Sequence, residues 1–202
     1  MAHTGYREAI IHYLSLTAKP PDKFSHQSRL YELSKKVAAE IAHDDDVLFA
    51  AAWLHDLGVF VGQRPAEPKA LAAWDWIAYA IAKTPALLDQ FGFPKAKVPA
   101  VIEAIRTHLP SSEPTTIEGV VLRDADMLEQ LGAVGILRTA SKVGRDTRFV
   151  KFSDVLGTLQ KNLEQLPEKL RLESTRRLAR PRILALEAFL AAAQEEACGV
   201  DW

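Results

Sequence analysis

The sequence predicts an all-α protein, a single-domain helical bundle with a charged helical extension at its C-terminal end. Apolar residues recur at helical spacing through most of the chain, and the alternation of apolar and polar residues that is typical of β-strands is absent. Prolines and glycines divide the periodic stretches into segments of helical length. With 202 residues, the chain is long enough for one domain with a sizeable core.

The breaks in the pattern define the helices in order. Residues 19–21 (KPP) stop the first helix, and the acidic run at residues 44–46 favours a new helix N-terminus, where carboxylates cap free N–H groups. Pro85 begins a short helix or turn, and Pro181 either kinks the last helix or begins its second half. We expect helices at residues 6–16, 22–42, 44–56, 69–83, 85–91, 96–109, 116–131 and 133–143, then longer charged helices from about residue 149.

This order of helices predicts three segments. They are an N-terminal helix at residues 1–20, a metal-binding core at residues 21–148, and C-terminal helices at residues 149–202 that pack on the core. The sequence does not set the oligomeric state, and a homodimer remains open.

Composition limits the classes of partner. Lysine and arginine number 25 against 26 acidic residues, so the net charge of −1 carries no specific signal for nucleic acid. No apolar run approaches the roughly 20 residues that span a bilayer, and the N-terminus lacks the pattern of a secretory signal. The single cysteine, Cys198, excludes an internal disulfide framework and a thiolate metal cluster. We expect a cytoplasmic protein without a membrane partner, in which histidine and carboxylate hold any metal.

A hydrophobic stretch at residues 47–58 (VLFAAAWLHDLG) ends in an adjacent imidazole and carboxylate, His55 and Asp56. Burying such a pair in apolar surroundings is unfavourable unless it has a partner, which a divalent metal supplies. His26 lies on the apolar stripe of the preceding helix, and an Asp-Ala-Asp triplet at residues 124–126 lies in a later apolar helix. A single histidine on such a stripe is more often a core residue bonded to a carbonyl, so the prediction depends on the combination. Two imidazoles and two carboxylates suit Mn²⁺, Fe, Ni²⁺, Co²⁺, Zn²⁺ or Mg²⁺.

The order His26, His55-Asp56 and Asp126 resembles the H…HD…D pattern of the HD-domain superfamily of metal-dependent phosphohydrolases. WLHDLG is similar to the end of the signature helix of that family. Residues 105–140 (IRTHLPSSEPTTIEGVVLRDADMLEQLGAVGILRTA) resemble a subgroup of small bacterial HD hydrolases, some of which act as nucleotide pyrophosphohydrolases. The resemblance covers about residues 20–195, and it implies that His26, His55, Asp56 and Asp126 are the metal ligands.

Two observations bear on which aspartate of the triplet is the metal ligand. Helical periodicity puts Asp124 on the apolar stripe of its helix and Asp126 on the opposite side. The Ala-Asp-x-Leu pattern of the family matches residues 125–128 and favours Asp126, with Asp124 as a supporting residue or substitute ligand. Met127 departs from the resemblance, because a basic residue that reaches the substrate phosphate often stands there in relatives.

The resemblance also implies residues on the substrate side. His108 would contact substrate, shuttle a proton or help bind a second metal, although a histidine at a helix end can simply stabilise the helix dipole. Arg138 matches a GIxRT-like stretch of the subgroup, and a surface ion pair explains it equally well. Arg123 and Lys142 are further candidates for neutralising a phosphate, in place of the basic residue that Met127 replaces.

The resulting prediction is hydrolysis of a phosphoester or phosphoanhydride bond in a nucleotide or related small phosphorylated metabolite. A metal-activated water attacks, Asp56 orients that water or accepts its proton, and His108 assists. One alternative is a hydrolase, hydratase or oxygenase that uses the same site on a substrate without phosphate. Another is a regulatory protein that binds a nucleotide or metal with little turnover. An all-helical interaction domain with buried histidines is the third.

Overall fold

The computed structural model describes residues 5–146 and 148–199, and within these ranges it contains helices, loops and an isolated bridge between Val61 and Arg64, but no β-strand. The predicted all-α class is confirmed. The chain forms two compact units, Met1–Arg123 and Asp124–Trp202. The boundary between them lies inside α7 (Ile117–Glu129), whereas the change in sequence pattern lies near residue 149. The expected packing of the C-terminal helices on the core stays a prediction.

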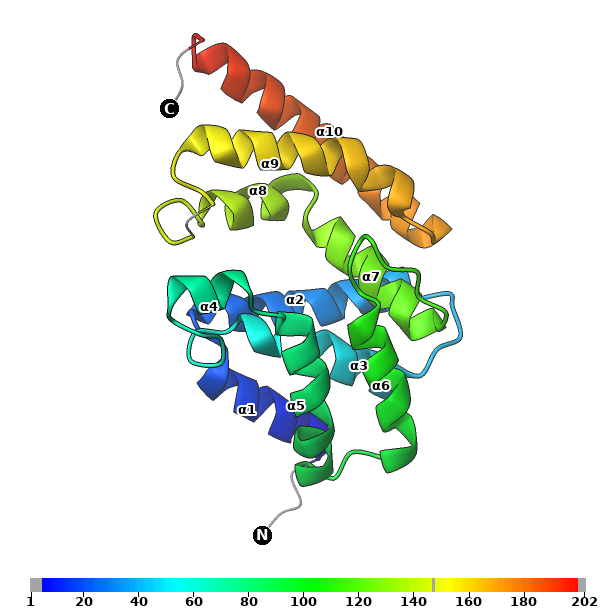
Figure 1. Ribbon diagram of the computed structural model, residues 1–202. Helices are drawn as coiled ribbons and strands as arrows, with labels where there is room; N and C mark the ends of the chain where they lie inside the picture. Colours follow the sequence, from blue (N-terminus) through cyan, green and yellow to red (C-terminus); the bar gives the residue numbers. More distant parts are fainter. Residues whose placement is uncertain (1–4, 147, 200–202) are drawn as a thin grey trace. The chain divides into compact units, whose positions relative to one another are not determined.

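The first unit is organised around α3 (Asp45–Leu54), which α1, α2 and α6 contact (Figure 1). Every residue of α3 from Val47 to Leu54 is buried. The three alanines of this helix have no exposed surface, because small side chains let the neighbouring helices approach closely. The other elements of this unit are α1 (Tyr6–Thr17), α2 (Pro21–Val37), η1 (Leu57–Val59), α4 (Pro68–Ala72), α5 (Trp76–Gln90), η2 (Lys95–Lys97) and α6 (Val98–Arg106).

The second unit is a set of three mutually contacting helices, α8 (Gly132–Ala140), α9 (Phe152–Gln165) and α10 (Glu173–Glu196), with the short turn η3 (Pro167–Lys169). Leu159 of α9 and Leu186 of α10 have no exposed surface. These leucines belong to the apolar core of the unit, and most of the charged residues of α9 and α10 are exposed or half-buried. The charged C-terminal sequence is therefore helical, as predicted.

The largest differences from the predicted helix ranges lie at the end of α2 and around Asp75 and Pro85. α2 ends at Val37, and residues 38–40 form a turn instead of a further helical turn. Asp75 begins a new helix because its side chain accepts the N–H of Ala78, so the predicted helix 69–83 is split into α4 and α5. Pro85 does not begin a helix but lies inside α5, with buried Ala80 and Leu87 on either side. Packing of these neighbours outweighs the roughly 3 kcal/mol that an interior proline costs a helix. α10 likewise continues through Pro181.

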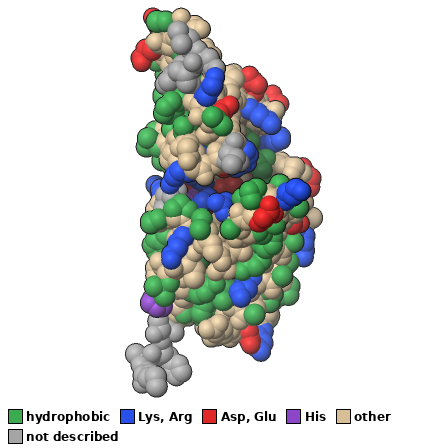
Figure 2. Space-filling model, turned by 60° about the vertical axis from the view of Figure 1, so that its left-hand side comes forward, with side chains coloured by type: hydrophobic (Ala, Val, Ile, Leu, Met, Phe, Trp, Pro, Cys, Tyr) green, Lys and Arg blue, Asp and Glu red, His purple; other side chains and the backbone are tan. Residues whose placement is uncertain are grey.

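Charged side chains of both signs are interspersed over the face drawn in Figure 2, in keeping with the net charge of −1. No helix within residues 5–146 and 148–199 is long and apolar enough to cross a membrane.

Candidate metal centre

The end of α3 carries the central pair of the site. Asp44 caps the start of this helix by accepting the N–H groups of Asp46 and Val47, and the buried apolar residues that follow hold the helix inside the first unit. His55 is the C-terminal cap and is 1% exposed. Asp56 follows with φ −96° and ψ 13°, which takes the chain out of the helix, and it is 8% exposed. A local helix end in an apolar core therefore buries an imidazole and a carboxylate side by side.

His26 comes to this pair from α2. Its side chain lies on the buried stripe of that helix and is 2% exposed, as the apolar spacing of the sequence predicts. The Asp56 carboxylate lies between the two imidazoles, with 3.6 Å from Oδ1 to His55 Nε2 and 3.7 Å from Oδ2 to His26 Nε2. The two rings meet edge to face with their centroids 5.5 Å apart. The predicted grouping of these three residues is present.

The spacing of the donor atoms fits one divalent ion. His26, His55 and Asp56 each offer a ligand atom within 4.8 Å of the other two, and all three residues are buried. Nitrogen and oxygen donors that lie about 2.0–2.2 Å from one ion are separated from each other by roughly 3–4 Å. The two nitrogen–oxygen separations of 3.6 and 3.7 Å fall in this range, and a mixed imidazole and carboxylate set suits the first-row divalent metals and magnesium.

Hydrogen bonds determine which ring nitrogen of each histidine faces the site. Nδ1 of His55 lies 3.0 Å from the carbonyl oxygen of Ala52. A carbonyl only accepts, so Nδ1 carries a proton, and Nε2, the atom that faces Asp56, is the one that would bind a metal ion. His108 is 1% exposed, and its Nδ1 lies 2.6 Å from the carbonyl oxygen of Ile105, so the same argument applies. The centroid of its ring lies 5.0 Å from that of His55.

The electrostatic surroundings keep Asp56 ionised. Burial raises the pKa of this carboxyl group, but the interactions with His55, Lys23 and His26 outweigh burial and hold the pKa well below its usual range. Lys23 Nζ lies 3.9 Å from Asp56 Oδ2. A carboxylate that stays charged across the physiological range can bind a metal ion without first losing a proton.

Sequence reasoning missed the residues that enclose this cluster. Trp76, at the start of α5, packs edge to face against His108 with 5.4 Å between ring centroids. Gly58 makes this position of α5 possible, because a Cβ atom there would lie 2.3 Å from the carbonyl oxygen of Trp76. The glycine in WLHDLG is the signal for this close approach. Lys23 was also missed, although its place one helical turn before His26 could have indicated it.

The two aspartates of α7 have different partners. Asp124 has no exposed surface, and its carboxylate accepts the backbone N–H groups of Arg171 and Leu172 within the second unit. Asp126 is half-buried and contacts the side-chain amide of Gln130. The periodicity argument is therefore consistent with the structure, since Asp124 faces the apolar side of α7. Asp124 serves as a backbone acceptor, which leaves Asp126 as the better candidate for the fourth ligand, and that role stays a prediction.

The three basic candidates each contact another part of the chain. Arg123 is 3% exposed and donates to the carbonyl oxygens of Leu109 and Pro110, so it fixes the loop that follows His108. Arg138 forms an ion pair with Glu129 within the second unit. Lys142 Nζ lies 5.1 Å from the centroid of the Phe149 ring. Contact of these residues with a substrate stays a prediction.

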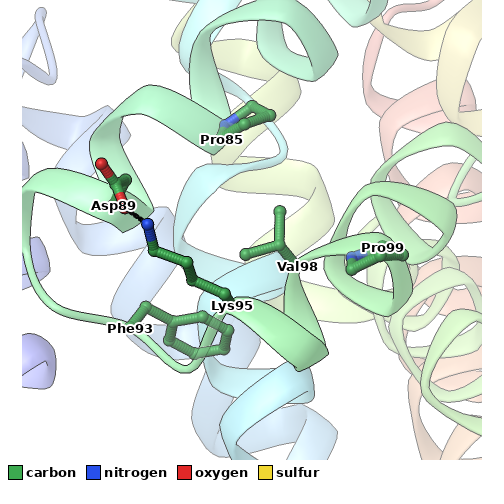
Figure 3. Close-up of a pocket in the computed structure, with 6 residues that line it drawn as sticks. All are labelled: Pro85, Asp89, Phe93, Lys95, Val98 and Pro99. Atoms are coloured by element: carbon green, nitrogen blue, oxygen red, sulfur yellow. Dashed lines mark ion pairs between the residues drawn. The ribbon is translucent and has the colours of Figure 1, made fainter.

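A surface pocket of about 320 Å³ lies elsewhere in the first unit (Figure 3). Its walls come from the second half of α5, the loop that follows and the start of α6, and two of its lining residues, Lys95 and Asp89, form an ion pair. The residues that line it include none of the candidate ligands. The pocket and the buried cluster are therefore separate features.

Comparison with known proteins places this geometry in a family. Residues 24–131, more than half of the chain, match the HD-domain family. No curated protein matches the sequence. A predicted HD superfamily hydrolase from an uncultured Thermotogales bacterium is 25% identical, with a TM-score of 0.66 over 95% of this chain and 93% of that one.

Two further structures share the fold at lower identity. Bacillus subtilis YpgQ, in complex with ADP, is 22% identical with a TM-score of 0.72 over 99% of both chains. An HD-superfamily hydrolase from Bacillus thuringiensis is 19% identical with a TM-score of 0.69 over 96% of this chain and 95% of that one. The matched residues 24–131 contain the His26, His55 and Asp56 cluster and Asp126. The chain belongs to the HD-domain family.

Proposed function

We propose that this protein is a metal-dependent phosphohydrolase that cleaves a phosphoester or phosphoanhydride bond in a nucleotide or a related small phosphorylated metabolite. The observation that carries the proposal is the buried group of two imidazoles and one carboxylate whose donor atoms lie within 4.8 Å of one another. His26, His55 and Asp56 would hold the metal, with Asp126 as the fourth ligand. The similarity in fold to YpgQ, which was crystallised with ADP, supports a nucleotide as the ligand class.

A bound divalent ion would supply a polarised phosphoryl oxygen and a water of lowered pKa. The other steps would depend on side chains of the protein. Asp56 would bind the ion through its ionised carboxylate, and it would orient the water or accept its proton. His108 is a second candidate for accepting a proton, because its Nδ1 faces the Ile105 carbonyl and Nε2 is then the atom that would take the proton. Arg138 and Lys142 are candidates for neutralising phosphoryl oxygens.

The proposal is tested by incubating the purified protein with nucleoside mono-, di- and triphosphates and measuring the release of phosphate and pyrophosphate. Each assay is run after chelation and again with Mn²⁺, Co²⁺, Ni²⁺, Zn²⁺ or Mg²⁺. We expect turnover that is lost on chelation, restored by at least one ion, and lost in His55→Ala. The Lys35→Met variant, on the outer part of α2, serves as the control for substitution on the same unit.

Other outcomes of these assays would support one of the alternative functions. Turnover of a substrate without phosphate by the metal-loaded protein identifies a different reaction at the same site. Saturable nucleotide binding without product identifies a regulatory protein. Absence of bound metal under every condition overturns the metal site itself and with it the proposal.

A further inference from the structure

Lys23 places a positive charge beside the candidate metal ligands. It lies in the first turn of α2, one turn before His26, and its Nζ atom is 3.9 Å from Asp56 Oδ2. Its side chain is 24% exposed, whereas that of His26 is 3% exposed. The Lys23 side chain therefore lies at the solvent-facing edge of the buried cluster.

The contact between Lys23 and Asp56 is loose. Its length of 3.9 Å exceeds a hydrogen bond, whereas the ammonium groups of Lys95 and Lys97 lie 2.8 Å from their carboxylates. The Lys23 ammonium is thus attracted to Asp56 without being fixed by it. A long flexible stem lets such a group move by several ångströms to another acceptor.

The position of Lys23 is not explained by the stability of α2. The N-terminal turn of a helix carries partial positive charge, so a lysine there is repelled and an acidic residue is favoured. Asp44 and Asp75 occupy the N-caps of α3 and α5, which shows the usual preference within this unit. Among the residues that the structure describes, Lys23 has its ion pair with Asp56, and the ion that Asp56 is proposed to hold would weaken this pair by repulsion.

We propose that Lys23 is an anion-binding residue of this site, which passes from Asp56 to an anionic oxygen of the substrate when a divalent metal binds to the carboxylate. The argument rests on the proposed function for the nature of the anion, a phosphoryl oxygen. An ammonium group and a metal ion would then hold the same phosphoryl group from two sides, and phosphate affinity would depend on both.

The test measures binding by calorimetry, so it does not depend on turnover. Inorganic phosphate is titrated into the Mn²⁺-loaded wild-type protein and into Lys23→Met, Lys23→Gln and Lys23→Arg. Mn²⁺ is also titrated into each metal-free protein without phosphate. Lys35→Met is the matched control, because Lys35 lies 12 residues later on the same helix, about 18 Å along its axis, and pairs with Glu32. Thermal unfolding checks that each variant is folded.

We expect Lys23→Met and Lys23→Gln to weaken phosphate binding by about 10-fold or more, because a charge-assisted contact is lost. Lys23→Arg should stay within about threefold of wild type, since it keeps the charge. Both neutral variants should bind Mn²⁺ at least as tightly as wild type, because a competing positive charge has been removed.

Three results would overturn the inference. They are no measurable phosphate binding by the Mn²⁺-loaded wild type, unchanged phosphate affinity in the neutral variants, and weakened Mn²⁺ binding in those variants. The last would show that Lys23 only positions Asp56. The outcome is separable from the proposed function: hydrolysis that is indifferent to Lys23 overturns this inference alone, and phosphate binding that needs Lys23 without any hydrolysis overturns only the proposed function.

Discussion

The two ends of α3 both carry acidic residues, but they have opposite surroundings. At the start of the helix, the carboxylates of Asp44 and Asp46 each lie 2.8 Å from the Lys97 ammonium. Asp46 also accepts hydrogen bonds from Tyr6 and Arg7. These acids have tight partners of opposite charge within the protein, and they join α1 and the start of α6 to α3.

At the other end of α3, Asp56 is more deeply buried yet more loosely held. Three basic side chains surround its carboxylate, and their nitrogen atoms lie 3.6–3.9 Å away, each farther than a hydrogen bond. The two nearest belong to imidazoles, and the hydrogen bond from His55 Nδ1 to Ala52 leaves Nε2 of that ring facing the carboxylate. The acids at the start of α3 thus form close ion pairs, whereas at its end the Asp56 carboxylate lies 3.6 and 3.7 Å from the two imidazole nitrogens. The close ion pairs at the start of α3 stabilise the fold, whereas the two imidazoles beside Asp56 make the other end of the helix the candidate metal centre.

The largest expected effect is the loss of metal binding when a candidate ligand at the C-terminal end of α3 is removed. His55→Ala removes one of the imidazole donors, so we expect metal affinity to fall by at least about 100-fold, with the helical fold retained. Metal content after gel filtration, measured by elemental analysis, and circular dichroism check the two halves of this prediction. Retention of stoichiometric metal by the variant would contradict it.

A second comparison of the same kind lies on α7. We expect Asp126→Asn to lower metal affinity by about 10-fold or more with little change in stability, since it removes a charged ligand. Asp124→Asn is the matched variant, and it should instead lower the free energy of unfolding by about 1–3 kcal/mol, because a buried carboxylate loses charge-assisted bonds from Arg171 and Leu172. Urea denaturation and metal titration of both variants distinguish a metal ligand from a structural acceptor. If Asp124→Asn weakened metal binding and Asp126→Asn lowered the stability, the ligand would be Asp124.

Asp46→Asn tests the start of α3, where the carboxylates form close ion pairs. This variant weakens the bonds from Tyr6, Arg7 and Lys97, so we expect the free energy of unfolding to fall by about 1–2 kcal/mol while metal affinity stays within twofold of wild type. Urea denaturation of the chelator-treated protein measures the first quantity, and metal titration measures the second. A loss of metal binding would show that the two ends of α3 are coupled.

The smallest expected effect is the change with pH in the contribution of Asp46 to the free energy of unfolding. Hydrogen bonds from Lys97, Tyr6 and Arg7 hold the pKa of Asp46 well below its usual range, although burial opposes them. A carboxyl whose pKa is lowered by folding stabilises the protein above its unfolded pKa and loses this contribution as the pH falls. Asp46 should therefore contribute roughly 0.3 kcal/mol less at pH 4 than at pH 7, and roughly 1.3 kcal/mol less at pH 3. Chelator-treated wild type and Asp46→Asn, unfolded in urea from pH 7 to 3, should converge in stability as the pH falls.

Much of the local structure could be predicted from the sequence, because helical periodicity and capping depend on neighbours within a few residues. The apolar run before His55-Asp56 predicted a buried helix that ends in this pair, and Asp44 caps that helix as expected. The prediction failed at Pro85, where buried residues on both sides keep α5 continuous. It also failed to divide α4 from α5, because the Asp75 cap lay within a periodic stretch.

The ligand set required more than local pattern. Helical spacing placed His26 on a buried stripe and Asp124 on the apolar side of α7, and both placements agree with the structure. Spacing alone could not show that α2 brings His26 to within 3.7 Å of Asp56, nor that Lys23 comes with it. Nor could it show that Asp124 accepts backbone N–H groups from residues 47 and 48 positions later.

The sequence by itself determined the all-α class, the burial of the His55-Asp56 pair and the resemblance to HD domains. Tertiary structure alone decided which side chains surround that pair. The physical reason is range: periodicity, capping and proline act within a turn or two of helix, whereas the partner of a buried charge is chosen by how whole helices pack. In this protein α2 brings an imidazole and an ammonium to Asp56, and His108, in the loop after α6, packs against both His55 and Trp76 of α5.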